Sequence, residues 1–235
     1  MGILYGIGVG PGESTYLTEQ ATKALAASSV ICVPKSKVER TSVAYSAAKA
    51  HLPATAIVEE LLFPMTRDEK ELQEHWEQAA SRVAQLVAEY GTVSFLTIGD
   101  PLLYSTFGYL MKCLGSLAPS VQVEVIPGIS SFTAAAALIK VPLVEKNERL
   151  AIVPVPISVD DFIGLSRYVD TVVFLKVSSA YEETLALLER TGFAHEAYLV
   201  SRVGSKDEFW TNDPFAYRDK AIDYLSLLIA KRRRN

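Results

Sequence analysis

The sequence has little of what several functional classes require. Its 235 residues include two cysteines, Cys32 and Cys113, and three histidines that lie far apart. Two cysteines alone form neither a disulfide framework nor a Cys-rich zinc site, so a reduced intracellular protein is the simpler expectation. The sequence contains no His-Glu-x-x-His, Cys-x-x-Cys or Gly-x-Ser-x-Gly pattern. These absences disfavour metalloenzymes and serine hydrolases, and they predict no protein-bound metal.

An excess of basic residues is also lacking. There are 23 Lys and Arg against 27 Asp and Glu, a net charge of −4. Such a chain is a poor general binder of nucleic acid, and the basic residues 231–234 are better explained as a solvated end. No run approaches the ~18 apolar residues of a membrane span, and the first residues lack the basic segment of a signal peptide. We therefore expect a cytoplasmic protein that binds neither nucleic acid nor membranes.

Hydrophobic residues make up 49% of the chain, and in roughly the first 130 residues short apolar runs alternate with amphipathic stretches. The apolar runs predict strands over residues 3–9, 30–33, 56–61, 92–98 and 121–126. The amphipathic stretches predict helices over residues 16–27, 43–51, 68–90 and 104–117. This alternation predicts a parallel sheet with helices on both faces. Because the strands at 93–98 and 121–126 lack a clean polar–apolar alternation, we expect both to be buried on both faces.

The helix over 68–90 has the clearest pattern, because its apolar residues recur every three or four positions. Thr66 followed by Glu69 predicts a capping box at its start, and Gly91 predicts its end.

The pattern changes after a small-residue helix predicted over residues 132–139. Short strand-like runs follow at 150–155, 171–177, 197–203, 208–210 and 224–230. A helix is predicted over 180–190, and residues 204–207 suit a hairpin turn. We therefore expect two α/β domains, residues 1–130 and a smaller domain at residues 131–235 with a mixed or antiparallel sheet.

Three glycine-containing loops follow predicted parallel strands. They are residues 6–12, Gly99-Asp100-Pro101 and Pro127-Gly128-Ile129-Ser130-Ser131. The first loop does not have the spacing of a dinucleotide-binding fingerprint or of a P-loop. Because ligands of open α/β sheets bind at the carboxyl ends of the strands, the three loops predict a shared binding crevice.

The ordered set of Gly8-Val9-Gly10-Pro11-Gly12, Gly99-Asp100-Pro101 and residues 126–131 resembles the tetrapyrrole (corrin/porphyrin) methylase family. Phe63-Pro64-Met65 and residues 99–107 resemble the branch that methylates C20 of precorrin-2 or cobalt-factor II. The resemblance implies two α/β domains with S-adenosylmethionine in a cleft between them. It also implies a tetrapyrrole substrate, with cobalt only within that substrate, and a homodimer.

The resemblance also implies which residues contact the cofactor. These are Pro11, Gly99, Asp100, Leu103, Tyr104, Ser105, Thr106, Ser130, Ser131, Lys176 and Gly204. Two departures bear on this set: Glu13-Ser14 stands where many relatives have Asp-Pro, and Lys176 stands where several have Met. At Lys176 a backbone contact is therefore the safer expectation.

The implied substrate carries many carboxylates, which favours basic side chains near it. The candidates are Lys35, Lys37, Arg40 and Arg202. The alternative, that these are solvated loop charges, is equally open at this point.

Methyl transfer from a sulfonium needs an in-line approach and no protein nucleophile, and ideal orientation supplies up to ~7–11 kcal/mol. We therefore expect Asp100 to orient the cofactor, and no residue is named as a general base. Other branches of the family, which act on another ring carbon, a modified protein residue or ribosomal RNA, stay open. A tetrapyrrole carrier without activity is a further alternative. The cobalt-containing substrate is preferred over the metal-free one.

Overall fold

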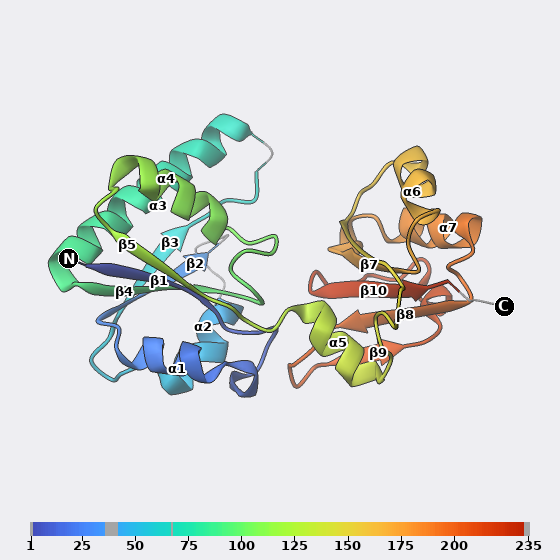
Figure 1. Cartoon of the computed structure of the whole chain (residues 1–235), viewed down its shortest axis with the longest axis horizontal. Helices are drawn as coiled ribbons and strands as arrows, with labels where there is room; N and C mark the ends of the chain where they lie inside the picture. The colour runs from blue at the N-terminus through green and yellow to red at the C-terminus, as the bar shows by residue number, and fades with distance from the viewer. Residues whose placement is uncertain (1, 36–41, 67, 233–235) are drawn as a thin grey trace. The chain divides into compact units, whose positions relative to one another are not determined.

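The computed structural model describes residues 2–35, 42–66 and 68–232, and it forms two compact units (Figure 1). Unit 1 is Met1–Ser130 and unit 2 is Ser131–Asn235. Among the described residues, no helix is both long enough and apolar enough to cross a bilayer.

Unit 1 is built on a five-stranded sheet in the order β3-β2-β4-β1-β5. The strands are β1 (Ile3–Gly8), β2 (Val30–Lys35), β3 (Ile57–Leu62), β4 (Thr92–Thr97) and β5 (Gln122–Ile126). Every neighbouring pair is parallel, which confirms the predicted parallel sheet.

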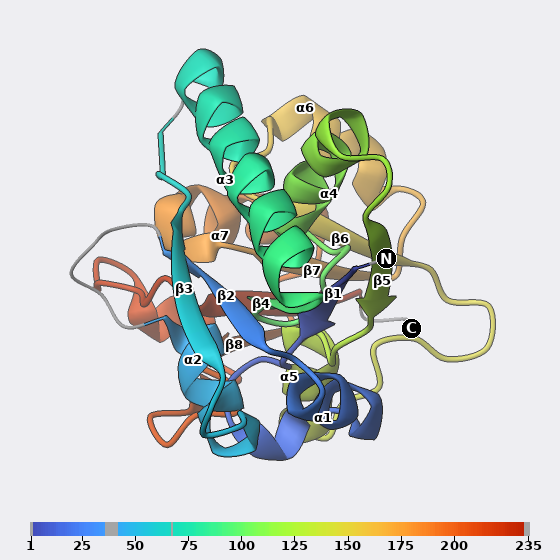
Figure 2. The same cartoon turned by 90° about the vertical axis from the view of Figure 1, so that its left-hand side faces the viewer.

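Helices cover both faces of this sheet (Figures 1 and 2). One face carries α3 (Glu69–Tyr90) and α4 (Phe107–Leu117), and the other carries α1 (Glu19–Ala26) and α2 (Val43–Ala48). Two short 3-10 helices, η1 (Ser14–Tyr16) and η2 (Lys49–His51), complete the unit. In β2, Val30 and Cys32 pack under α3, while Ile31 and Val33 pack against α1 and α2. A continuous apolar run is therefore what a central strand with two buried faces requires.

The expectation of burial on both faces holds for β4, where every residue except Thr92 is buried. It is wrong for β5. This strand lies at the edge of the sheet, and Gln122 and Glu124 are exposed while Val123 and Val125 are partly buried. An edge strand has one neighbour only, so fewer elements cover its faces.

The start of α3 also differs from the prediction. Asp68, not Thr66, is the N-cap: its Oδ1 accepts hydrogen bonds from the backbone N–H groups of Lys70 (2.9 Å) and Glu71 (3.3 Å). Thr66 instead accepts one from the N–H of Asp68. The predicted capping box is therefore wrong. The predicted end is confirmed, since Gly91 has a φ of 78° and its N–H binds the carbonyl of Val87.

Unit 2 contains a second five-stranded sheet, in the order β6-β7-β10-β8-β9. Its strands are β6 (Leu150–Pro154), β7 (Thr171–Leu175), β8 (Glu196–Ser201), β9 (Phe209–Thr211) and β10 (Ser226–Lys231). β6 and β7 are parallel and the other pairs are antiparallel, so the sheet is mixed. The helical elements are α5 (Ser131–Ile139), α6 (Val159–Ser166), α7 (Tyr181–Thr191), η3 (Val177–Ser179) and η4 (Pro214–Tyr217).

The core of unit 2 lies between this sheet and helices α6 and α7. Phe162 of α6 lies against Phe174 of β7, with ring centroids 5.1 Å apart, and against Phe193, which follows α7. The sequence did not single out α6. Ser158 caps it by accepting a hydrogen bond from the N–H of Asp161.

Candidate functional site

The three glycine loops of unit 1 meet because β4, β1 and β5 are neighbours in the sheet. Beyond the strands, Gly10 and Gly99 form a further bridge. The N–H of Gly99 donates to the carbonyl of Gly10 at 2.9 Å, and the reciprocal bond is 3.4 Å long. Both residues have a positive φ (76° and 70°), a backbone conformation that glycine adopts without a steric penalty.

Gly8 and Gly128 are needed for a different reason, which is close approach of backbones. A Cβ on Gly8 would lie 2.5 Å from the carbonyl oxygen of Gly99 and 2.6 Å from the nitrogen of Gly128. A Cβ on Gly128 would overlap the same carbonyl oxygen of Gly99. The loops after β1, β4 and β5 therefore touch through their main chains at a point where no side chain fits.

Asp100 connects two of these loops through its carboxylate. Its Oδ1 accepts a hydrogen bond from the N–H of Leu102 at 2.9 Å, within its own loop. Its Oδ2 accepts one from the N–H of Gly128 at 3.1 Å, in the loop after β5. Hydrogen bonds to an ionised carboxylate are the stronger kind, so this side chain holds the two loops in one geometry.

The segment after Asp100 leads into α4 and is fixed by Ser105. The Ser105 hydroxyl lies 2.8 Å from that of Thr97, the last residue of β4, and it accepts a hydrogen bond from the N–H of Phe107. Tyr104 has a φ of 51°, which is uncommon outside glycine, and its side chain is 50% exposed. Strained, exposed residues of this kind cluster at functional sites.

The cofactor residues that the sequence predicts in unit 1 all fall on these loops. Pro11 and Gly99 are buried, Tyr104 is exposed, and the others are partly exposed: Asp100, Leu103, Ser105, Thr106 and Ser130. Ser131 is the first residue of α5, in unit 2. Sequence reasoning did not single out Thr97, because a hydroxyl at the end of an apolar strand carries no pattern of its own.

Lys176 and Gly204, the other two cofactor candidates of unit 2, lie at the same end of the strands of its sheet. Lys176 directly follows β7 and Gly204 follows β8, and both strands run antiparallel to β10 between them. Lys176 is exposed with a φ of 60°, and its carbonyl accepts hydrogen bonds from the N–H and hydroxyl of Ser179. The buried Gly204 has a φ of 74°, and its N–H donates to the carboxylate of Glu208 at 2.7 Å.

The candidate substrate residues that the structure describes are paired with acidic groups of their own unit. The ammonium of Lys35 lies 2.6 Å from the carboxylate of Glu60. Arg202 contacts Asp223 at 2.9 Å and Asp207 at 3.9 Å. Lys37 and Arg40 lie outside the described residues. A substrate carboxylate at Lys35 or Arg202 would therefore share the cation with an existing partner.

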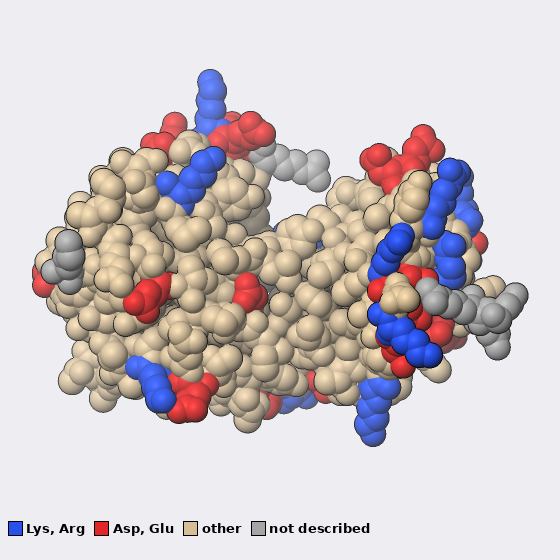
Figure 3. Space-filling view, viewed as in Figure 1, with Lys and Arg blue, Asp and Glu red and all other residues tan. Residues whose placement is uncertain are grey.

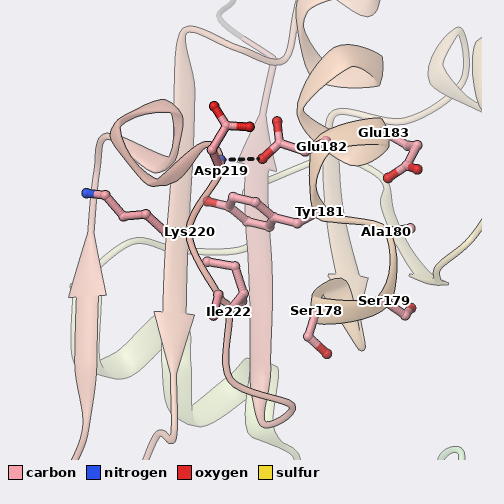
Figure 4. A pocket seen from close by; sticks show the side chains of 10 residues that line it. Ser178, Ser179, Ala180, Tyr181, Glu182, Glu183, Asp219, Lys220 and Ile222 are labelled. Atoms are coloured by element: carbon pink, nitrogen blue, oxygen red, sulfur yellow. Dashed lines mark hydrogen bonds between the residues drawn. The ribbon is translucent and has the colours of Figure 1, made fainter.

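An open pocket of about 440 Å³ lies beside the Lys176 turn in unit 2 (Figure 4). Its ten lining residues are Ser178, Ser179, Ala180, Tyr181, Glu182, Glu183, Asp219, Lys220, Ala221 and Ile222. Three of them are acidic, and Glu182 accepts a hydrogen bond from the N–H of Asp219 at 2.9 Å. Burial and the nearby Glu182 raise the pKa of Tyr181, whose hydroxyl donates a hydrogen bond to the carbonyl of Pro214. None of the residues predicted from the sequence lines this pocket, and its acidic lining suits no polycarboxylate.

Comparison with known proteins identifies a family that this chain matches. The sequence profile of the tetrapyrrole (corrin/porphyrin) methylases matches residues 3–215. The chain is 38% identical over 232 residues to a protein of Methanocaldococcus jannaschii named "Probable cobalt-precorrin-2 C(20)-methyltransferase", with 97% of this chain and 96% of that protein covered. It is 27% identical over 240 residues to "Precorrin-2 C(20)-methyltransferase" of Sinorhizobium sp, with 97% and 95% covered.

A solved structure is similar in fold. It is uroporphyrin-III C-methyl transferase from Thermus thermophilus, complexed with S-adenosylhomocysteine. The TM-score is 0.70 at 22% sequence identity, and the match covers 98% of this chain and 97% of that one.

Proposed function

The chain belongs to the tetrapyrrole (corrin/porphyrin) methylases, and from this premise we propose that it transfers a methyl group from S-adenosylmethionine to C20 of precorrin-2 in its cobalt-containing form. This places it in cobalamin biosynthesis. The observation that carries the proposal is the 38% identity over 97% of the chain to a relative named for that reaction. A relative named for cobalt-precorrin-2 and one named for precorrin-2 are each 27% identical, so the cobalt form is supported by the 38% identical relative alone.

The loops after β1, β4 and β5 fit the cofactor. At Gly8 and Gly128 the backbones of the three loops pack against one another with no room for a Cβ, while the Cβ position of Gly99 faces open space, so main chain borders that space at the end of β4. When bound, S-adenosylmethionine supplies an electrophilic methyl group. We assign its binding to Pro11, Gly99, Asp100, Leu103, Tyr104, Ser105, Thr106, Ser130 and Ser131, with main-chain contributions from Lys176 and Gly204.

Within this set we assign Asp100 a positioning role. Both of its carboxylate oxygens already accept backbone hydrogen bonds, which holds the loops of β4 and β5 together. Holding two reactants in line supplies a large share of the acceleration of a displacement reaction. A rigid arrangement of these loops is therefore the contribution that the chain's own residues make.

A direct test offers metal-free precorrin-2 and its cobalt complex side by side, with isotope-labelled S-adenosylmethionine and without oxygen. The expected result is label at C20 of the cobalt product, located by NMR. Label on another carbon, or in neither product while the cofactor binds by calorimetry, would move the chain to another branch of the family. Absence of cofactor binding would favour the carrier without activity.

The basic candidates are tested separately. Reversing Lys35 and Lys37 together to Glu should raise the substrate KM sharply, because the substrate carries many carboxylates. The matched control reverses Lys23 and Lys49, which are exposed on the same unit, and should leave KM unchanged. Equal KM values in both double variants would show that Lys35 and Lys37 do not bind the substrate. Thermal unfolding of each variant accounts for the lost ion pair with Glu60.

We further propose that the protein is a homodimer in the cytoplasm, as the resemblance to the family implies. Light scattering coupled to size-exclusion chromatography tests the dimer: the 25.7 kDa chain should elute with twice that mass. Elution as a monomer would contradict the proposal.

A further inference from the structure

A second pocket in unit 2 has a basic lining and takes no part in the proposed methyl transfer. It encloses about 270 Å³ and is lined by Asn147, Arg149, Arg167, Tyr168, Val169, Asp170 and Arg232. The lining includes three arginines and one aspartate, a formal excess of two positive charges in a chain of net charge −4. Figure 3 shows Lys and Arg side chains gathered around this end of unit 2, near the C terminus, with acidic side chains among them.

The pocket lies at the end of the strands opposite to the end that carries Lys176 and Gly204. Arg149 precedes β6, Asp170 precedes β7, and Arg232 follows β10. Lys176 follows the other end of β7, and a strand of this length spans roughly 16 Å. Within unit 2, the basic pocket is therefore separate from the strand ends that we assign to the cofactor.

The backbone around the pocket is held firmly. The N–H groups of Asp170 and Thr171 both donate to the carbonyl of Arg149, at 2.9 and 3.1 Å. The N–H of Arg149 donates in return to the Asp170 carboxylate at 2.9 Å, and the N–H of Arg232 donates to the carbonyl of Asp170 at 2.8 Å. The Asp170 carboxylate is thus partly occupied by the backbone N–H of Arg149, which reduces its repulsion of an incoming anion.

Arg232 is fixed in place but not satisfied. Its Nη2 donates to the carbonyl of Ser166 at 2.6 Å, and its guanidinium lies 5.0 Å from the centre of the Phe193 ring. Its Nε is buried and, among the described residues, has no hydrogen-bond partner. A buried donor without a partner costs about 1–3 kcal/mol, so Arg232 is held in the lining of this pocket at a cost in stability.

We propose that this basic pocket binds an oxyanion of the phosphate class. The planar guanidinium groups of Arg149, Arg167 and Arg232 suit two-point hydrogen bonding to tetrahedral oxyanions. Asn147 and Tyr168 add neutral donors beside them. The anion is either free phosphate or a phosphate group carried on a larger molecule, and the chemistry at the arginines is the same in both cases.

The experiment measures binding of inorganic phosphate and of ADP to the full chain by calorimetry at low ionic strength, where screening is weak. The test variant is Arg149→Gln/Arg167→Gln. Both side chains are exposed, so their loss leaves the core intact, whereas Arg232 is packed against Phe193 and is left unchanged. The matched control is Arg190→Gln/Lys206→Gln, which removes two exposed charges from the same unit outside the pocket.

The expected result is that the test variant weakens phosphate binding at least tenfold while the control stays within twofold of the unmodified chain. ADP that binds at least tenfold more tightly than phosphate, and is lost in the same variant, identifies a carried phosphate group. Equal affinities identify free phosphate. The proposal is overturned if neither anion binds the unmodified chain, or if the test and control variants bind equally. Neither measurement depends on methyl transfer, so failure here leaves the proposed function untouched.

Discussion

Replacing Asp100 with Asn tests how the loops of unit 1 are held together. The carboxylate accepts the N–H of Leu102 on Oδ1 and the N–H of Gly128 on Oδ2. Asn keeps one accepting oxygen and turns an NH2 group toward the second N–H, so only one of the two bonds survives. The substitution is nearly isosteric, so shape is preserved while the connection between the loops is lost.

The cost follows from the type of bond removed. A hydrogen bond to a charged group contributes about 1.5–3 kcal/mol when buried, and Asp100 is partly exposed, so we expect a loss of about 1–2 kcal/mol. For a unit of this size that lowers Tm by roughly 3–8 °C. If the same loop geometry binds S-adenosylmethionine, its Kd should rise by about tenfold, the factor that corresponds to 1.4 kcal/mol.

A matched control is present in the same unit. Asp68 also accepts two backbone N–H groups, but both bind the single oxygen Oδ1. Asn retains that oxygen and is an equally good N-cap, so Asp68→Asn should leave stability and cofactor affinity unchanged. Calorimetric titration with S-adenosylmethionine and thermal unfolding of both variants separate the two kinds of carboxylate.

Two outcomes would refute this reasoning. If Asp100→Asn has the Tm and cofactor affinity of the unmodified chain, the link from Asp100 to Gly128 does not fix the loops. If the variant keeps its affinity for the cofactor but no longer turns over, Asp100 is the proton acceptor and not a positioning residue.

Two further predictions concern the glycines and cysteines. Gly128→Ala should prevent cofactor binding and reduce the yield of folded protein, because the new Cβ would overlap the carbonyl of Gly99. The control is Gly115→Ala in α4, which should be neutral or stabilising because the space around its Cβ is open. Circular dichroism and calorimetry distinguish the two variants. Burial, followed by the charge of Glu59, raises the pKa of the Cys32 thiol from 9.0 to about 12, so the stability it contributes is complete below pH 9 and is lost as the pH rises toward 12. At pH 8 a thiol reagent should therefore label only the partly exposed Cys113 in the folded chain and both cysteines in denaturant; rapid labelling of a folded Cys113→Ser variant would contradict this.

Much of the secondary structure could be read from local patterns. The apolar run at 30–33 became β2, buried on both faces. The three- and four-residue spacing of apolar side chains over 68–90 became α3, with Ala79, Ala80, Val83, Leu86 and Val87 buried along one face. Both patterns arise from the repeat of a helix or strand, which involves only neighbours along the chain.

The errors occurred where the result depends on partners that are distant in the sequence or on competition between similar residues. β5 was expected to be buried on both faces, yet it lies at the sheet edge, and strand order is set by pairing between distant segments. Thr66 was predicted to cap α3, whereas Asp68, two residues further on, accepts the N–H groups of the first turn.

The candidate site likewise has features that local sequence patterns predicted and contacts that they did not predict. Glycine loops after β1, β4 and β5 were recognisable from the sequence, since Gly-rich turns after apolar runs are local signals. That Asp100 of one loop accepts the N–H of Gly128 in another, and that Lys35 and Arg202 carry acidic partners, was decided only by the tertiary structure. Hydrogen bonds and ion pairs between segments depend on where the folded sheet brings them, and no local pattern in the chain encodes that position.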